Sequence, residues 1–148
     1  MRAIVQRVKR AQVSVEGRVA GRIERGLLVL LGVAACDIGA DAREIANRVV
    51  RMRIFADAGG KMNLDLAAVR GELLVVSQFT LLADTSSGRR PSFTGAAPPQ
   101  QARELYQQFL SLCRASGIKT EQGEFGAMME VELVNDGPVT FILDSRAK

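Results

Sequence analysis

The sequence predicts a single α+β domain over residues 1–148, with a mostly antiparallel, barrel-like sheet and two main helices. Three observations support this prediction. The chain of 148 residues has the length of one domain. Its first third alternates apolar and polar residues and is punctuated by glycines, as hairpin strands are. Two later segments repeat apolar residues at helical spacing, without the regular strand–helix alternation of a parallel sheet.

The first elements are strands joined by tight turns. Val13 and Val15 alternate with polar neighbours, and Gly17 permits a turn into a second alternating segment over residues 19–23. The apolar run over residues 27–31 predicts a strand that is buried on both faces.

Two helices are predicted further along the chain. Asp41 is the expected N-cap of the first, because Glu44 three residues later completes a capping-box pattern. Ile45 and Val49 belong to the apolar stripe of this helix. The apolar face of the second helix consists of Ala102, Leu105, Tyr106, Phe109, Leu112 and Cys113.

Short strands and loops complete the domain. The order is a short strand at 54–55, a turn at 57–61, a buried strand that ends at the sequence S-Q-F-T, a long loop at 84–99, and two final strands around 129–133 and 139–143. The loop at 84–99 holds three of the four prolines. Loops of this length inside a compact domain are often functional.

Composition excludes several kinds of chemistry. The chain contains no histidine, which excludes Ser-His-Asp and Cys-His catalysis and histidine metal sites. Cys36 and Cys113 alone make no zinc site. No apolar run is long enough to cross a bilayer, and the charged start is unlike a signal peptide, so a soluble cytoplasmic protein is expected. The net charge of +4 suits a polyanionic partner such as RNA.

The S-Q-F-T segment (residues 77–80) places polar side chains directly after a buried strand. Buried polar groups cost free energy unless they find partners. Either Ser77, Gln78 and Thr80 turn outward into water, or the end of the strand offers them and its backbone N–H groups to a ligand. Backbone donors at such a place can stabilise an oxyanion without a histidine.

The Gly-Pro segment (residues 135–140, N-D-G-P-V-T) also has two interpretations. Asn-Asp-Gly is strong turn chemistry, so a plain hairpin between the two final strands is one of them. The other is a rigid backbone element at Gly137-Pro138 that measures the shape of a ligand, with a cis bond at Pro138.

The sequence resembles the D-aminoacyl-tRNA deacylase family of bacterial and eukaryotic type along essentially its whole length. S-Q-F-T-L followed by N-x-G-P-V-T is a specific pair of motifs, and neither departs from the family pattern. The matching segments are residues 1–8, 26–33, 53–55, 60–64, 77–81, 90–93 and 134–140.

The resemblance implies an enzyme that hydrolyses the ester between a D-amino acid and the terminal ribose of tRNA, and that also removes glycine from mischarged tRNA. It implies a homodimer without metal or cofactor, with the active site at the subunit interface. The residues it assigns to that site are Ser77, Gln78, Phe79 and Thr80 as the lining, with the Phe79 and Thr80 N–H groups near the scissile carbonyl, Met129 in the wall, Gly137 and Pro138 inserted from the partner to reject L-side chains, and Arg7 as a brace.

Other readings of the chain remain open at this point. Thr80 could act as a covalent nucleophile, or backbone donors could act together with the 2′-hydroxyl of the substrate. Related enzymes with relaxed chirality share the fold but differ at both motifs. A non-enzymatic, basic RNA-binding dimer would explain the charge but not the pair of motifs, and a purely structural dimer would leave the polar strand end unexplained.

Overall fold

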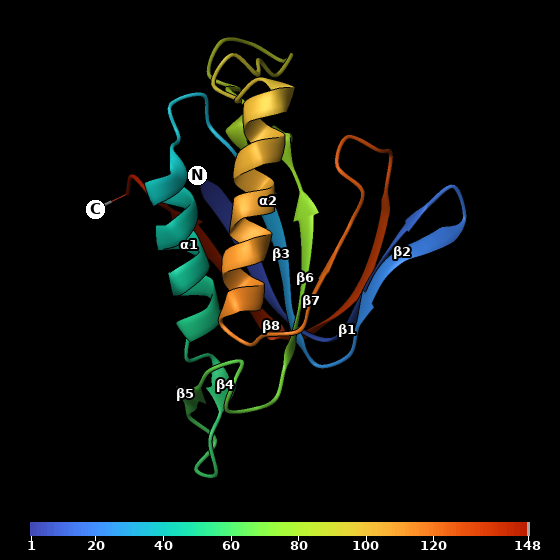
Figure 1. The fold of residues 1–148 in the computed structure, drawn as a ribbon, viewed down its shortest axis with the longest axis vertical. Coiled ribbons are helices and arrows are strands. Elements are labelled where there is room, and N and C mark those ends of the chain that lie inside the picture. The colour runs from blue at the N-terminus through green and yellow to red at the C-terminus, as the bar shows by residue number, and fades with distance from the viewer. Residues whose placement is uncertain (148) are drawn as a thin grey trace.

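The structure, a computed structural model, describes residues 1–147. Two helices lie side by side across one face of a curved sheet (Figure 1), which confirms the predicted α+β, barrel-like domain. The helices are α1 (Gly39–Arg51), α2 (Pro99–Ala115) and the short 3-10 helix η1 (Phe79–Leu82). The strands are β1 (Arg2–Val15), β2 (Arg18–Ile23), β3 (Gly26–Gly32), β4 (Phe55–Ala56), β5 (Met62–Leu64), β6 (Glu72–Ser77), β7 (Thr120–Gln122) and β8 (Glu130–Asp144).

Strand β1 organises the sheet. Its first half pairs with β3 and its second half with β2, while β8 pairs along its other edge, and all of these pairs are antiparallel. Strands β3 and β6 are parallel, and so are β6 and β7, because α1 and α2 lie in the connections between them. The sheet is therefore mixed, and its two parallel pairs were not predicted from the sequence.

The main core lies between the sheet and the two helices. The apolar stripes of α1 and α2 are buried against it, and β3 is buried on both faces as predicted. Cys113 is fully buried there, whereas Cys36 is exposed. A smaller apolar cluster fills the other side of the sheet and contains Val8, Ala11, Val13, Ile23, Leu28, Leu74 and Val76. None of the helices within residues 1–147 has the length and apolarity needed to cross a membrane.

The predicted N-cap of the first helix is wrong. Helix α1 begins at Gly39, and Ile38 occupies the cap position, so Asp41 lies inside the first turn. The Asp41 carboxylate accepts a hydrogen bond from the Ile38 N–H at 2.8 Å. Asp41 therefore satisfies a free N–H group at the helix start from within the helix rather than from in front of it.

The two separate final strands that were expected are one strand, and the hairpin interpretation of the Gly-Pro segment is wrong. Strand β8 is continuous, and it pairs with β1 both before and after the Gly-Pro segment. Val8 pairs with Asn135 and Gln6 pairs with Thr140, so residues 136–139 of β8 stand opposite Arg7 alone. We call these residues the bulge. Extra residues on one strand of a pair push the backbone out of the ladder, and bulges often occur beside functional sites.

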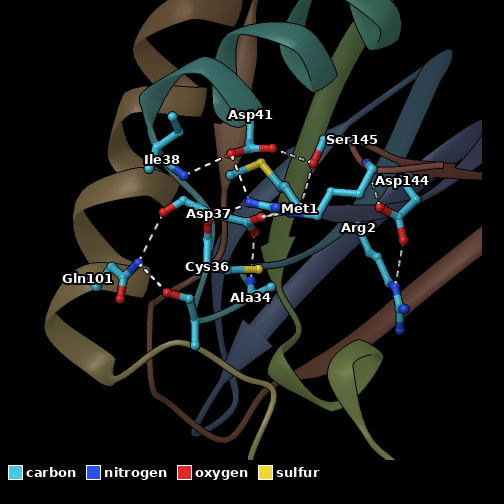
Figure 2. A network of polar contacts seen from close by, with 12 residues as sticks. Met1, Arg2, Ala34, Cys36, Asp37, Ile38, Asp41, Gln101, Asp144 and Ser145 are labelled. Carbon is cyan, nitrogen blue, oxygen red and sulfur yellow. Dashed lines mark hydrogen bonds and ion pairs between the residues drawn. The ribbon is translucent and has the colours of Figure 1, made fainter. Parts of the chain in front are cut away.

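A polar network joins the chain ends to the helices (Figure 2). The Met1 amino group is buried and donates to the Asp37 carboxylate at 2.7 Å and to the Ser145 hydroxyl at 2.8 Å. Asp37 also accepts from the Ala34 N–H, and the Gln101 side chain of α2 donates to its carbonyl. The network fixes the start of β1 beside the loop after β3.

Candidate active site

The S-Q-F-T segment begins where β6 leaves the core. Residues 73–76 are buried, Ser77 and Gln78 are half-buried, and Phe79 and Thr80 are exposed. The Gln78 N–H still donates to the Leu31 carbonyl at 2.8 Å, after which the chain turns into η1. The polar residues of this apolar run therefore coincide with its exit from the sheet.

Two neighbouring N–H groups are free at the start of η1. The backbone N–H groups of Phe79 and Thr80 have no acceptor among residues 1–147, while the N–H of Leu81 donates to the Gln78 carbonyl. The first N–H groups of any helix lack partners within that helix. Adjacent free donors of this kind can bind a carbonyl oxygen that gains negative charge during a reaction.

Close packing against β3 holds η1 in place. A Cβ atom at Gly32 would lie 2.5 Å from the Leu82 side chain and 2.9 Å from the Gln78 carbonyl, so a larger residue would push η1 away. The Arg2 side chain donates to the Leu81 carbonyl at 3.1 Å. The role of Arg2 leaves no local pattern in the sequence, because the contact spans 79 positions of the chain.

An aromatic pair connects η1 to the long loop. The rings of Phe79 and Phe93 lie edge to face with centroids 5.0 Å apart, a favoured geometry for aromatic pairs. Phe79 is 57% exposed and Phe93 is 38% exposed. The loop brings Arg89 and Arg90, both exposed, to the same end of the molecule as the S-Q-F-T segment.

The side chain of Thr80 has a partner that cannot take up a proton. The Gln78 side-chain amide donates to the Thr80 hydroxyl oxygen. An amide is not a general base, and residues 1–147 include no histidine. The Cys113 thiol lies in the core, and burial raises its pKa to about 12. It is therefore no nucleophile for this site.

Met129 lies beside the end of β6. Its sulfur would be 2.7 Å from a Cβ atom at Gly123, and the Gly123 N–H donates to the carbonyl of Val75, two residues before Ser77. Met129, the residue before β8, is half-buried and packs against the apolar cluster that includes Val76, the residue before Ser77.

The bulge is held by side chains from β1 and β8. The Arg7 guanidinium donates to the Asp136 carbonyl at 3.0 Å and to the Ile54 carbonyl at 2.5 Å. The Asn135 side chain donates to the Arg7 carbonyl at 2.9 Å and to the Val139 carbonyl at 3.2 Å. Gly137 and Pro138, joined by a cis peptide bond, are exposed at its tip.

The S-Q-F-T segment and the bulge do not meet within one chain. The bulge on β8 stands opposite Arg7 of β1. Across β3, the register places Arg7 in line with Leu73 of β6, and it places Ser77 of β6 in line with Ala3 of β1. Four residues along the strands and three strand spacings across the sheet put the two motifs on the order of 20 Å apart. A group as small as a single amino-acid residue therefore cannot touch both motifs of one chain.

A separate cleft of about 720 Å³ lies over β1, β2 and β8 and contains no residue of either motif. Its lining includes Arg10, Gln12, Arg22 and Glu132. The Gln12 side chain donates to Glu132 and accepts from Arg22, so these groups already satisfy one another. Among residues 1–147, no group of three Cys, Asp or Glu side chains is arranged to hold a metal ion.

Comparisons with known proteins find relatives that match almost the whole chain. A family model described as D-Tyr-tRNA(Tyr) deacylase matches residues 4–144. A D-aminoacyl-tRNA deacylase of Thermosipho africanus is 55% identical over 146 residues, which cover 99% of this chain and 98% of that protein. One from Desulfatibacillum aliphaticivorans is 58% identical over 99% of this chain and 100% of its own length.

Solved structures also share the fold. A protein described as c-Myc DNA Unwinding Element Binding Protein superposes with a TM-score of 0.93 at 38% identity, covering 99% of this chain and all of that one. A probable eukaryotic D-amino acid tRNA deacylase superposes with a TM-score of 0.85 at 15% identity, covering 96% and 97% of the two chains. The second likeness concerns the fold alone.

Proposed function

Because the chain belongs to the D-Tyr-tRNA(Tyr) deacylase family and is an ester hydrolase of D-aminoacyl-tRNA, we propose that its active site is shared between two copies of the chain. The S-Q-F-T segment of one subunit faces the partner's Gly137 and the partner's Pro138, and the aminoacyl ester lies between them. The separation of the two motifs within one chain, on the order of 20 Å, carries this proposal.

Catalysis rests on backbone donors. The Phe79 and Thr80 N–H groups bind the carbonyl oxygen of the ester as a water oxygen attacks the carbonyl carbon. The bond from that carbon to the ribose oxygen then breaks, the ribose oxygen takes a proton, and the D-amino acid leaves as a carboxylate. The 2′-hydroxyl of the terminal ribose orients the water, and an aminoacyl ester is reactive enough for such a modest site.

A covalent route through Thr80 is the alternative mechanism. It requires a base that removes the hydroxyl proton as the oxygen attacks. The neighbour of the Thr80 hydroxyl is the Gln78 amide, which donates a hydrogen bond and accepts no proton. This contact favours the substrate-assisted route.

Chirality is read by backbone atoms of the bulge. The partner's Gly137 and the partner's Pro138 form a wall that an L-side chain strikes and a D-side chain avoids. Arg7 and Asn135 hold the bulge rigid within its own chain, and Met129 forms part of the wall. Such a wall ignores the identity of the side chain, so many D-amino acids are accepted. Glycine has no side chain to reject and is also removed.

The enzyme works in the cytoplasm, where aminoacylated tRNA is used. A non-enzymatic RNA-binding dimer would need neither the free N–H pair at η1 nor the exposed Gly137 and Pro138. These features, together with membership of a deacylase family, favour the enzyme over that alternative.

Mixing of subunits tests the shared site. One variant carries Thr80→Pro, which removes an N–H group of the proposed oxyanion site. The other carries Gly137→Ala, whose Cβ would lie 2.2 Å from the backbone nitrogen of Val139 and would deform the bulge. Each variant alone should hydrolyse D-Tyr-tRNA poorly, because Thr80→Pro lacks a donor and the deformed bulge of Gly137→Ala no longer leaves room for the ester. After unfolding and refolding together, each hybrid dimer contains one intact site, and activity should return.

The same mixing with two batches of Thr80→Pro serves as the control and should restore nothing. If the mixed variants also remain inactive while sedimentation shows hybrid dimers, the two motifs do not form one site. Parallel assays with D-Tyr-tRNA and L-Tyr-tRNA on the intact protein test the chirality. Substantial hydrolysis of the L-ester would contradict the backbone wall.

A further inference from the structure

Positive side chains gather at the end of the molecule opposite the S-Q-F-T segment. The β4–β5 hairpin projects from this end and lies far from the loop over residues 84–99 (Figure 1). Strands β3 and β6 both begin here, and α1 ends here. We call this region the basic end, and its exposed cationic residues are Arg25, Arg51, Arg53, Lys61 and Arg70.

The cations of the basic end form no ion pairs with the carboxylates of the described residues. None of them has a carboxylate within 4.0 Å among residues 1–147. Arg53 donates to the carbonyl of Asn63, and Arg25 lies 5.4 Å above the ring of Phe55. The nearby Asp57 carboxylate accepts the N–H groups of Gly59 and Lys61 inside the hairpin turn.

One arginine connects the basic end to the bulge. Arg7 donates from one side of its guanidinium to the Ile54 carbonyl, at the base of the hairpin, and from the other side to the Asp136 carbonyl in the bulge. The hairpin and the bulge are thus held together by a single side chain. Wherever the bulge docks, the hairpin accompanies it.

We propose that the basic end of one subunit binds the phosphates at the acceptor end of the tRNA whose ester lies in the partner subunit's active site. This inference rests on the proposed shared site, because the bulge then carries the hairpin to the edge of that site. The nucleotides that precede the terminal adenosine leave the site past the hairpin. Lys61 lies at the hairpin turn, and the neighbouring Met62 is 51% exposed and offers apolar contact to a ribose or base.

Charge favours RNA over a second copy of this chain as the occupant. The whole chain carries a net charge of +4, so a like-charged basic surface gains nothing by facing another copy. Phosphates of RNA bind favourably to unpaired lysine and arginine side chains, and this binding releases counterions. The hairpin therefore supplies affinity for the nucleic acid, while the S-Q-F-T segment and the bulge act on the ester.

The test uses the whole dimer with Lys61→Glu. Two substrates are compared: D-Tyr-tRNA, and the D-tyrosyl ester of adenosine, which has no phosphate. We expect KM for D-Tyr-tRNA to rise about tenfold, with kcat within about twofold of the original, and the salt dependence of binding to weaken. Hydrolysis of the adenosine ester should not change. Arg43→Glu makes a matched charge reversal near the other end of α1 and should leave both substrates unaffected.

Three results would overturn the inference. Lys61→Glu could behave like Arg43→Glu on D-Tyr-tRNA, it could slow the adenosine ester to the same extent, or it could dissociate the dimer in sedimentation. Binding of uncharged tRNA, measured directly, separates this inference from the shared site. If Lys61→Glu weakens that binding while subunit mixing restores no activity, the basic end binds tRNA and the shared site alone fails.

Discussion

At the scale of single residues, the proposed site relies on backbone groups more than on side chains. The Phe79 and Thr80 N–H groups are free, whereas the Thr80 hydroxyl and the Gln78 amide contact each other. Replacing a side chain there leaves the N–H donors in place. Substitutions that keep these N–H groups should therefore lower the rate by modest factors.

Thr80→Ala provides the direct test of this view. The variant keeps both N–H groups and loses only the hydroxyl contact, so the single-turnover rate on D-Tyr-tRNA should fall by about tenfold or less. Rapid-quench kinetics measure the rate, and mass spectrometry of the quenched enzyme looks for an acyl group. Complete loss of activity in this variant, or an acyl-threonine trapped on the unsubstituted protein, would instead contradict the substrate-assisted route.

Gly137→Ala tests the bulge as the wall that reads chirality. The new Cβ would lie 2.2 Å from the Val139 backbone nitrogen and 2.6 Å from its side chain, so the bulge must change shape. We expect the ratio of D-Tyr-tRNA to L-Tyr-tRNA hydrolysis to fall by about tenfold or more, equivalent to about 1.4 kcal/mol of discrimination. Gly39→Ala is the control, because its Cβ meets only the flexible end of Gln108. Unchanged selectivity in Gly137→Ala would remove the wall from the bulge.

At the scale of elements, the periodicity of apolar residues predicted the strands and helices that local interactions determine. Alternation at Val13 and Val15 and the helical stripes specified where strands and helices occur, because burial on one face sets both periods. The strand exit at Ser77 followed from the cost of burying polar groups. The site residues themselves came from the resemblance to a known family and not from these patterns.

Features that depend on distant partners were missed or misplaced. Asn-Asp-Gly predicts a hairpin locally, yet β1 pairs with β8 on both sides of it and makes one bulged strand. Asp41 is a residue type that often caps helices, but α1 begins at Gly39 and the Asp41 carboxylate accepts the Ile38 N–H from inside the first turn. The parallel pairing of β6 with β3 and β7 depends on where α1 and α2 pack. The residues of the strands themselves do not reveal this packing.

The first turn of α1 makes a stability prediction that depends on pH. Burial raises the pKa of Asp41, but hydrogen bonds from the Ile38 N–H and the Ser145 hydroxyl, together with nearby positive charges, outweigh it and leave this pKa below its ordinary value. A lowered pKa in the folded state contributes stability that is complete above the unfolded value, about 3.9, and is lost as pH falls through the folded value.

Asp41→Asn should therefore cost about 1 kcal/mol of unfolding free energy at pH 7. The difference from the original protein should shrink as the pH falls below the unfolded value. Urea titrations at pH 7 and at a pH below the unfolded value measure this difference at each pH. All are made at one protein concentration, since the stability of the proposed dimer would depend on it. Glu44→Gln is the control, because its ion pair with Arg48 at 3.6 Å is exposed and contributes little. A cost for Asp41→Asn that is equal at both pH values would exclude the charge as its source.

At the scale of the whole molecule, the sheet keeps the two motifs apart. Strand register fixes both the bulge and Ser77, and no rotation of a side chain closes a gap on the order of 20 Å. A sequence pattern contains no information on this distance, because it arises only when β8, β1, β3 and β6 assemble. The same register places the basic end beside the bulge and away from the S-Q-F-T segment of its own chain.

Dilution tests whether the assembled dimer is the active unit. If each site needs residues from two chains, specific activity on D-Tyr-tRNA should fall as the enzyme is diluted through the dimer dissociation constant, in parallel with the dimer fraction from sedimentation. Lowering tRNA concentration at constant enzyme is the control and should change only saturation. If a monomer keeps full specific activity, one chain holds a complete site. The partner's bulge would then have no part in hydrolysis. Loss of activity in proportion to the dimer fraction leaves the interface as the place where the two motifs meet.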